Sequence, residues 1–277
     1  MIPFVHLHVH SQYSILDGQA PVKALVDKAI ADGMRGMAIT DHGNMFGIKE
    51  FHDYVAKLNK KRGDDEKFKP IFGCEVYVAN NSRHDRIDKR DNGNHLILLA
   101  KNLKGYKNLI KIVSHAWTEG MYYHPRTDHS ELEKYHEGII CSSACLGGEV
   151  PQLIMNGQMS QARETIRWFK SVFGDDYYLE LQRHKATVAH ANHETYEKQR
   201  LVNDALIQFA RELDIAHHTA LKLGPRFLQQ NLYQSTCHSI DILSWIQCCR
   251  LVFLIRLKLL HFNVLGKRQT GINNNHQ

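Results

Sequence analysis

The sequence predicts an α/β fold built from repeated βα units around a parallel sheet or barrel. Over most of the chain, short apolar segments alternate with stretches whose apolar residues recur with helical period, which is typical of strands and their covering helices. A chain of 277 residues is long enough for one main domain with an appendage. With 43% hydrophobic and 23% charged residues, the composition excludes a disordered or fibrous protein.

The expected elements follow one another in regular alternation. Strands are expected at Phe4–Val9, Gly36–Thr40, Pro70–Ala79, His95–Ala100, Gly138–Ser142 and Tyr177–Leu181. Helices are expected between them, among others at Ala20–Asp32, Leu103–Trp117 and Ser160–Phe173. The first helix shows the pattern clearly, because apolar residues from Val22 to Ile30 form one stripe that ends at Gly33.

The charge of the chain is unevenly distributed. Residues 216–277 hold seven Lys or Arg and one Asp, whereas residues 1–215 hold 28 basic and 28 acidic residues. Because residues 1–215 have no net charge, charge does not indicate what the main domain binds. We divide the chain into a main domain, residues 1–215, and a divergent basic tail, residues 216–277, which is expected to be aberrant or poorly ordered.

The sequence also bounds where the protein is expected to work. The N-terminus lacks the basic and apolar regions of a secretory signal, so a cytoplasmic location is expected. Arg256 and Lys258 interrupt the longest apolar run of the tail, so no membrane span is expected. The six cysteines are unevenly spaced, which favours single thiols or metal ligands over a disulfide framework.

The strongest chemical signal is the run His6-Leu7-His8-Val9-His10. Alternate residues of a strand point to the same face, so these imidazoles are expected to project together near the carboxyl end of the strand, where barrel active sites form. Converging imidazoles are typical of a metal site. Ordinary histidines of a half-buried strand are the alternative.

The second signal is an apolar strand that ends in Thr40-Asp41-His42-Gly43. The arrangement suits a metal-binding His42 beside a supporting carboxylate, and Gly43 would allow a sharp turn. The alternative is a turn in which Asp41 caps the next helix.

Three further candidates lie in or beside apolar strands. Glu75 stands inside a strand expected to be buried, where a carboxylate is costly unless it is paired or bound to a metal. His95 begins the next strand. Cys145 follows the fifth strand and would offer a soft thiolate ligand, with a small buried thiol as the alternative.

Together these segments resemble the polymerase-and-histidinol-phosphatase (PHP) domain of bacterial replicative DNA polymerase III alpha subunits. The resemblance covers residues 3–215 and is carried by HLHVHS, YSILDG, ITDHGNMFG, GCEVYV, GNHLILLAKNLKGYKNLIKIVS and CSSACLGGEV, in that order. Intervening blocks such as YYHPRTD and DDYYLELQRH are similar to the polymerase family rather than to free-standing PHP phosphatases.

This resemblance implies a distorted (β/α)7 barrel with divalent metals, zinc, manganese or iron, at the carboxyl ends of its strands. The implied ligands are His8, His10, Asp17, His42, Glu75, His95 and Cys145. Asp41 would lie behind them as a candidate catalytic residue. The implied chemistry is metal-dependent phosphoester hydrolysis, such as a 3′-5′ exonuclease, in a DNA-directed DNA polymerase whose partners are DNA and the other replicative subunits.

The chain departs from the family at two points. Where the family carries an Asp-x-His on its seventh strand, this chain reads AHHTALKLGPRF after Ile215, so two ligands and the proper seventh strand are expected to be missing. His217 and His218 are poor substitutes. The chain also has no D-x-D pair for nucleotidyl transfer, so this polypeptide alone is not expected to synthesise DNA.

Two other functions remain open at this stage. One is a stand-alone PHP phosphoesterase that acts on a small phosphorylated substrate, and the polymerase-like blocks argue against it. The other is a catalytically silent scaffold or gene fragment, which the missing Asp-x-His favours. Metal content distinguishes the silent scaffold from the metal-dependent enzymes.

Overall fold

The computed structural model describes residues 4–15, 17–89, 91–184 and 194–220. The expectation of an aberrant tail concerns residues 216–277, and all but the first five of these lie outside the described residues.

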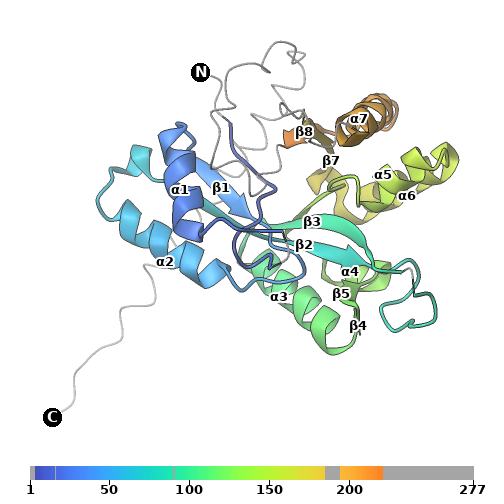
Figure 1. The fold of residues 1–277 in the computed structure, drawn as a ribbon, viewed down its shortest axis with the longest axis horizontal. Coiled ribbons are helices and arrows are strands. Elements are labelled where there is room, and N and C mark those ends of the chain that lie inside the picture. Colours follow the sequence, from blue (N-terminus) through green and yellow to red (C-terminus); the bar gives the residue numbers. More distant parts are fainter. Residues whose placement is uncertain (1–3, 16, 90, 185–193, 221–277) are drawn as a thin grey trace.

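A curled eight-stranded sheet forms the centre of the fold (Figure 1). Its strands follow the order β4-β5-β2-β3-β6-β7-β8, and β1 pairs with β2 off this path. Their bounds are β1 (Gly36–Ile39), β2 (Lys69–Val78), β3 (Asn94–Ala100), β4 (Met121–Tyr122), β5 (His124–Thr127), β6 (Ile139–Ser142), β7 (Tyr177–Gln182) and β8 (His217–Ala220).

Most pairs of neighbouring strands are parallel, as the sequence predicted. β3 is an exception, because it runs antiparallel to both β2 and β6, and β4 is antiparallel to β5. The reversal of β3 brings its first residues to the same end of the sheet as the last residues of β2 and β6.

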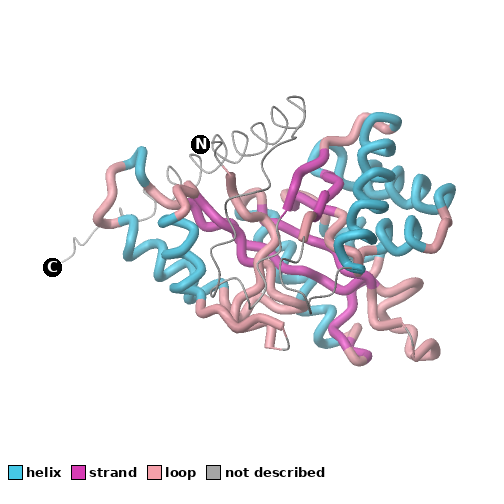
Figure 2. The backbone as a smooth tube through the Cα atoms, turned by 45° about the horizontal axis from the view of Figure 1, so that its top comes forward, coloured by secondary structure: helices cyan, strands magenta, loops and turns pink. Residues whose placement is uncertain are grey.

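Helices cover the outer face of the sheet (Figures 1 and 2). They are α1 (Val22–Ala31), α2 (Ile48–Asn59), α3 (Leu103–Thr118), α4 (His129–Tyr135), α5 (Glu149–Met155), α6 (Met159–Phe173) and α7 (Glu194–Glu212), with 3₁₀ turns at Asp64–Glu66 and Gly174–Asp176. α1 and α2 pack beside β1, whereas α5, α6 and α7 cover the other end of the sheet (Figure 1).

Strand residues alternate between two hydrophobic cores. On β3, Leu96 and Leu98 belong to the core under the helices, whereas Ile97 and Leu99 belong to a smaller core on the inner face of the curled sheet. This alternation is what a sheet covered by helices on one face and curled around a second core on the other requires. The prediction of a distorted β/α barrel is confirmed.

The expected first strand, Phe4–Val9, is not a regular strand. Its backbone bonds to β1 at two places, from Ala38 N to His6 O at 2.8 Å and from Thr40 N to Val9 O at 2.8 Å. The backbone bends at Leu7 and His8 between these contacts. Strict alternation is lost there, which has consequences for the histidines.

A short strand does follow Ile215. β8 pairs in parallel with β7 and ends at Ala220, the last described residue. A strand therefore occupies the position next to β7, although its sequence lacks the Asp-x-His that the family carries there.

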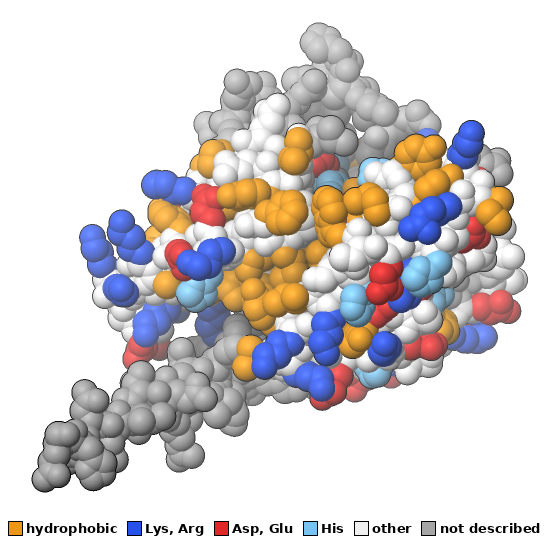
Figure 3. Space-filling view, turned by 90° about the horizontal axis from the view of Figure 1, so that it is seen from below, with side chains coloured by type: hydrophobic (Ala, Val, Ile, Leu, Met, Phe, Trp, Pro, Cys, Tyr) orange, Lys and Arg blue, Asp and Glu red, His pale blue; other side chains and the backbone are white. Residues whose placement is uncertain are grey.

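The surface seen from below carries hydrophobic side chains in its middle and Lys and Arg side chains around its edge (Figure 3). Among the exposed large hydrophobic residues of the described chain are Phe46 and Trp117, whose ring centroids lie 6.0 Å apart. None of the described helices is long and apolar enough to cross a membrane.

Candidate metal centre

The inner face of the sheet changes from apolar to polar toward one end of the barrel. On β6, buried Ile140 is followed by Ser142, and on β7, Tyr178 is followed by Glu180 and Gln182. On antiparallel β3 the same change appears at the first residues rather than the last. The strands thereby collect buried polar side chains above a common apolar floor.

Glu75, on the inner face of β2, lies at the centre of these polar groups. It is fully buried, and its Oε2 lies 2.5 Å from His10 Nε2, 3.1 Å from His8 Nε2 and 3.2 Å from His42 Nδ1. Its Oε1 lies 2.9 Å from His95 Nδ1. The carboxylate that the sequence marked as needing a partner therefore faces imidazoles on every side.

His8 and His10 converge as predicted, but His6 does not join them. His10 Nε2 lies 3.3 Å from His8 Nε2, whereas the His6 ring packs edge-on against Phe4 at 4.8 Å between centroids. The bend in the backbone at Leu7 and His8 separates the first histidine from the other two.

Asp17 and His42 extend the cluster toward solvent. Asp17 Oδ2 lies 3.0 Å from His42 Nε2 and 3.3 Å from His10 Nδ1. The turn after His42 depends on Gly43, whose φ is 62° and whose added Cβ would lie 2.7 Å from Pro125 Cγ. The predicted sharp turn at Gly43 is confirmed.

Cys145 lies at the other edge of the cluster. Its Sγ is 3.4 Å from His95 Nδ1 and 3.6 Å from Glu75 Oε1. Since β6 ends at Ser142, shortly before this cysteine, and His95 is the second residue of β3, the antiparallel pairing of these two strands brings the thiol and the imidazole together.

Asp41 is buried, and its carboxylate is engaged by the serines of the loop between His10 and Asp17. It accepts hydrogen bonds from Ser11 N at 2.6 Å, Ser11 Oγ at 2.8 Å and Ser14 Oγ at 3.0 Å. The alternative that Asp41 caps the next helix is wrong, because the residue before α2 is Gly47 and no side chain caps that helix. Asp41 instead orders the loop that connects His10 with Asp17.

Within the cluster, His8 holds its proton tightly and Glu75 is ionised. Burial disfavours a charged His8, but the carboxylates of Glu180 and Glu75 raise its pKa to about 10. Burial likewise disfavours a charged Glu75, yet His8, His10 and His95 hold its pKa well below the usual range. A cation that binds here must therefore replace protons.

The donor set fits a divalent cation. Three overlapping groups, each with ligand atoms within 4.8 Å of one another, are present in the described residues: His8, His10 and Glu75; His10, Asp17 and His42; His42, Glu75 and His95. His42 Nδ1 is buried without a hydrogen-bond partner, although Glu75 Oε2 lies nearby. A buried imidazole nitrogen without a hydrogen-bond partner, next to a carboxylate, suits a position that a cation would fill.

Sequence reasoning missed two residues of this region. Glu180 is buried on β7, and its Oε1 lies 2.7 Å from His8 Nδ1. The rule that identified Glu75, a carboxylate inside a buried strand, applies equally to Glu180. Tyr77 stacks between His42 and His124, at 5.8 and 4.5 Å between centroids, and no sequence pattern predicts such a contact.

His217 and His218 do not join the cluster. His218 is buried on β8 opposite Glu180, with its Nε2 2.9 Å from Ser142 Oγ. Neither histidine belongs to any of the candidate ligand groups within the described residues. The Asp-x-His that the resemblance implied does not occur in the sequence after Ile215.

Comparison with known families decides what kind of site this is. Residues 6–184 match the PHP domain family, a span that includes every predicted ligand. The chain belongs to this family. Family membership and the His/Glu cluster together indicate that the PHP domain binds divalent metal.

Sequence relatives of this PHP domain include alpha subunits of DNA polymerase III. It is 46% identical over 216 residues to that of Borreliella burgdorferi, which covers 76% of this chain and 17% of the relative. It is 46% identical over 184 residues to that of Treponema pallidum, covering 65% and 15%, and 40% identical over 219 residues to that of Aquifex aeolicus, covering 76% and 17%. The chain thus spans less than a fifth of the length of these relatives.

Among solved structures, an amidohydrolase from Chromobacterium violaceum is similar, with a TM-score of 0.44, 12% identity and coverage of 78% of this chain and 86% of that one. This likeness is too distant to add to the assignment.

Proposed function

We propose that this PHP domain binds divalent metal ions around Glu75 and uses them in phosphoester hydrolysis, as part of a DNA polymerase III alpha subunit. The observation that carries the proposal is the surroundings of Glu75: its carboxylate contacts imidazole nitrogens of His8, His10, His42 and His95. Imidazoles can exchange their protons for a metal, and metal binding would offset the free-energy cost of burying these polar groups.

The proposed ligands are those that the sequence predicted. They are His8, His10, Asp17, His42, Glu75, His95 and Cys145, with Asp41 supporting the loop between His10 and Asp17. A mixture of imidazole, carboxylate and thiolate suits zinc, manganese or iron better than an ion that prefers oxygen alone. Bound metals would polarise a phosphate and lower the pKa of a coordinated water.

The residues around the cluster suit a partly enclosed reaction. Glu75 and His8 are fully buried, so they hold the inner side of the site free of water. Asp17 has a side chain that is 39% exposed, so a substrate would approach from its side. Burial disfavours an ionised Asp17, but hydrogen bonds from His10 and His42 hold its pKa well below the usual range, so this entrance offers an ionised carboxylate to a cation.

The names of the relatives suggest the substrate class. A polymerase subunit handles DNA, so the proposed substrate is the 3′ end of a single DNA strand, and the proposed partners are DNA and the other replicative subunits, in the cytoplasm. The second candidate function is a silent scaffold for the polymerase. The absence of an Asp-x-His after Ile215 specifically favours it.

The first test is the metal content of the purified chain beside that of a His8→Ala, His10→Ala double variant. Bound metal that disappears in the variant would support the proposed site, and no metal in either protein would leave the scaffold. Hydrolysis of 3′-ended single-stranded DNA is then compared with that of a small phosphomonoester. Activity on the phosphomonoester alone would favour a stand-alone phosphoesterase.

A further inference from the structure

We propose that Glu180 is a positioning residue of the metal centre, which fixes the tautomer and the ring orientation of His8. This inference rests on the proposed metal-binding function and names a residue outside the predicted ligand set. Glu180 is 2% exposed on the inner face of β7, and its Oε1 lies 2.7 Å from Nδ1 of fully buried His8.

The two nitrogens of His8 face different partners. Nδ1 faces Glu180, whereas Nε2 lies 3.1 Å from Glu75 Oε2 and 3.3 Å from His10 Nε2. An ionised carboxylate can only accept a hydrogen bond, so Nδ1 must carry the hydrogen that Glu180 binds. Nε2 is then the nitrogen available to a cation, and it already points into the group formed with His10 and Glu75.

Glu180 is itself held in place by its neighbours. Gln182 Nε2 donates to Glu180 Oε1 at 2.6 Å, and Ser142 Oγ donates to Oε2 at 3.2 Å. Both carboxylate oxygens are therefore engaged, and the carboxylate cannot rotate away from His8 without losing these bonds. A ring held by such a carboxylate loses little further freedom when it binds a metal.

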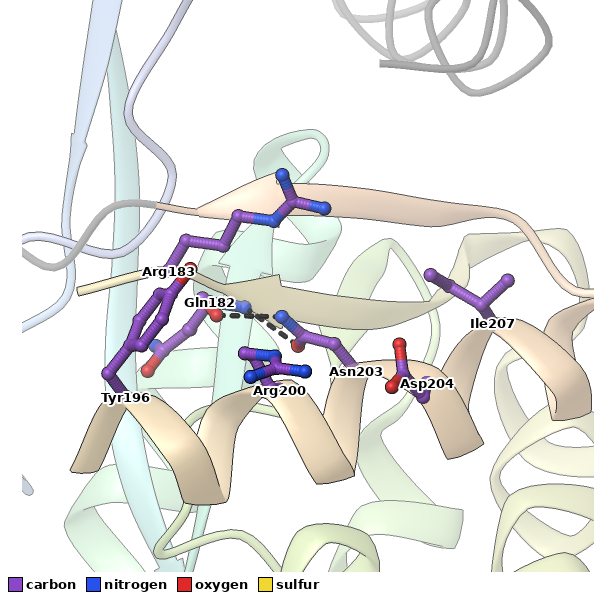
Figure 4. A pocket seen from close by; sticks show the side chains of 7 residues that line it. All are labelled: Gln182, Arg183, Tyr196, Arg200, Asn203, Asp204 and Ile207. Atoms are coloured by element: carbon purple, nitrogen blue, oxygen red, sulfur yellow. Dashed lines mark hydrogen bonds between the residues drawn. The ribbon is translucent and has the colours of Figure 1, made fainter. Parts of the chain in front are cut away.

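The support continues into α7. Gln182 N donates to Asn203 Oδ1 at 3.2 Å, and Asn203 Nδ2 donates to Gln182 O at 2.8 Å, so the end of β7 is fixed to the helix (Figure 4). Asn203 also lines a small surface pocket together with Arg183, Tyr196 and Arg200 (Figure 4). None of these three residues belongs to a candidate ligand group of the described residues.

Glu180 does not qualify as a ligand itself. It contacts the side of the His8 ring that faces away from Glu75, and it belongs to none of the candidate ligand groups of the described residues. The remaining alternative is that Glu180 serves folding alone, as the counter-charge of a buried histidine. The two roles differ in what they predict for metal affinity in a folded variant.

The test measures zinc affinity by competition with a chelator in the unaltered chain and in two variants. Glu180→Leu removes the acceptor, and we expect zinc to bind about 10- to 100-fold more weakly, the usual cost of losing such a partner. Glu180→Gln keeps the shape and an acceptor oxygen, so its loss is expected to be smaller. Circular dichroism at the temperature of the titration shows that each variant is folded.

A matched control removes a carboxylate–imidazole contact outside the cluster. Glu149 Oε2 lies 2.9 Å from His129 Nε2, and neither residue is among the predicted ligands. Glu149→Leu is therefore expected to leave zinc affinity unchanged. An equal loss in this control would show that the Glu180 result reflects general damage and would overturn the proposal.

Nitrogen NMR of the zinc-loaded, ¹⁵N-labelled protein gives a readout that a folding role would not move. We expect the His8 resonances of a ring protonated at Nδ1 and metal-bound at Nε2, and the opposite tautomer would overturn the proposal even if Glu180→Leu failed to fold. Normal zinc affinity in both Glu180 variants would overturn this inference alone. Absence of zinc binding in the unaltered chain would overturn the proposed function as well.

Discussion

Two clusters of buried charged side chains neutralise their carboxylates in different ways. Around Glu75, a buried carboxylate faces imidazoles. Around the loop between β2 and β3, buried carboxylates of this loop and of the start of α4 face arginines instead. Arg126 is fully buried and donates to Asp91 Oδ2 at 2.8 Å, and Arg83 lies 2.7 Å from Glu131 Oε2 and 3.1 Å from Asp128 Oδ2.

The arginine cluster holds the loop between β2 and β3 in place, although the polar composition of this loop is typical of a segment exposed to solvent. Arg126 also donates to the backbone carbonyls of Arg83 and Asp85, so one guanidinium gathers both ends of residues 83–91. Asp128 accepts from the backbone N–H of Arg83 at 2.9 Å and caps α4 through the N–H of Glu131 at 3.0 Å.

The difference teaches how to separate a structural ion pair from a metal site before any metal is seen. Guanidinium groups keep their charge at every accessible pH, so Arg83 and Arg126 cannot exchange a proton for a metal. Imidazoles carry a removable proton, so the Glu75 cluster can accept a different cation in its place. The predictions below test this contrast.

The largest effect on stability is expected from Arg126→Met. The change leaves the Asp91 carboxylate and several carbonyls buried without their partner, which costs about 3–5 kcal/mol in the free energy of unfolding. Urea denaturation measures the loss. Lys104→Met, which removes the exposed partner of Glu137, is the control; a similar loss in both variants would refute the structural importance of the buried cluster.

Glu75→Gln is expected to act on metal affinity more than on the metal-free fold. The histidines around it can release protons when the carboxylate is neutralised, but a shared ligand is gone, so zinc affinity should fall by about 100-fold, or ~3 kcal/mol. Competition titration with a chelator measures this change. Zinc affinity that survives in Glu75→Gln would mean that the cluster is merely another salt-bridge network.

Asp128→Asn tests the arginine cluster through the pH dependence of the free energy of unfolding. Burial opposes ionisation of Asp128, but hydrogen bonds from Arg83, Ser130 and Glu131 hold its pKa below the ordinary 3.8. The stabilisation from the ionised Asp128 carboxylate is therefore present above pH 3.8 and is lost as the pH falls through the lowered pKa. We expect the variant to be about 1–3 kcal/mol less stable at pH 7. The difference should shrink at low pH, and a difference that grows on acidification would contradict this assignment.

Trp117→Phe should have the smallest effect. It removes one neutral hydrogen bond, from the indole Nε1 to the carbonyl of Gly43 at 2.7 Å, and should cost about 1 kcal/mol. Because Gly43 follows His42 directly, the zinc stoichiometry is measured as well and should not change. A lost equivalent of zinc would show that the backbone after His42 is held by this bond rather than by the cluster.

The parts of the fold with long periodic patterns were predicted well from the sequence. The expected helix Leu103–Trp117 matches α3, Leu103–Thr118, and the expected strand Pro70–Ala79 matches β2, Lys69–Val78. Direction was not predictable, because a period of two residues is the same in both orientations; the antiparallel course of β3 was therefore not expected. Short β4 carries too few residues to form a pattern.

The candidate site was also predictable only in part. The residue types and their places at strand ends identified the cluster around Glu75, because metal sites require those donors. Which nitrogen of His8 faces the cluster could not be predicted, since it depends on Glu180, 172 residues away in the chain. The exclusion of His6 depends on a local bend that no periodic pattern encodes.

The alternation along β2 makes this strand intolerant of a change in length. Cys74 and Val76 fill the core under the helices, whereas Glu75 between them faces the imidazoles. Deleting one residue of β2 before Glu75 would turn the Glu75 carboxylate into the hydrophobic core under the helices. A thiol or a valine would then lie among the histidines. Length variation between homologous domains should therefore concentrate in the loops that flank β2, and the strand itself should keep its residue count.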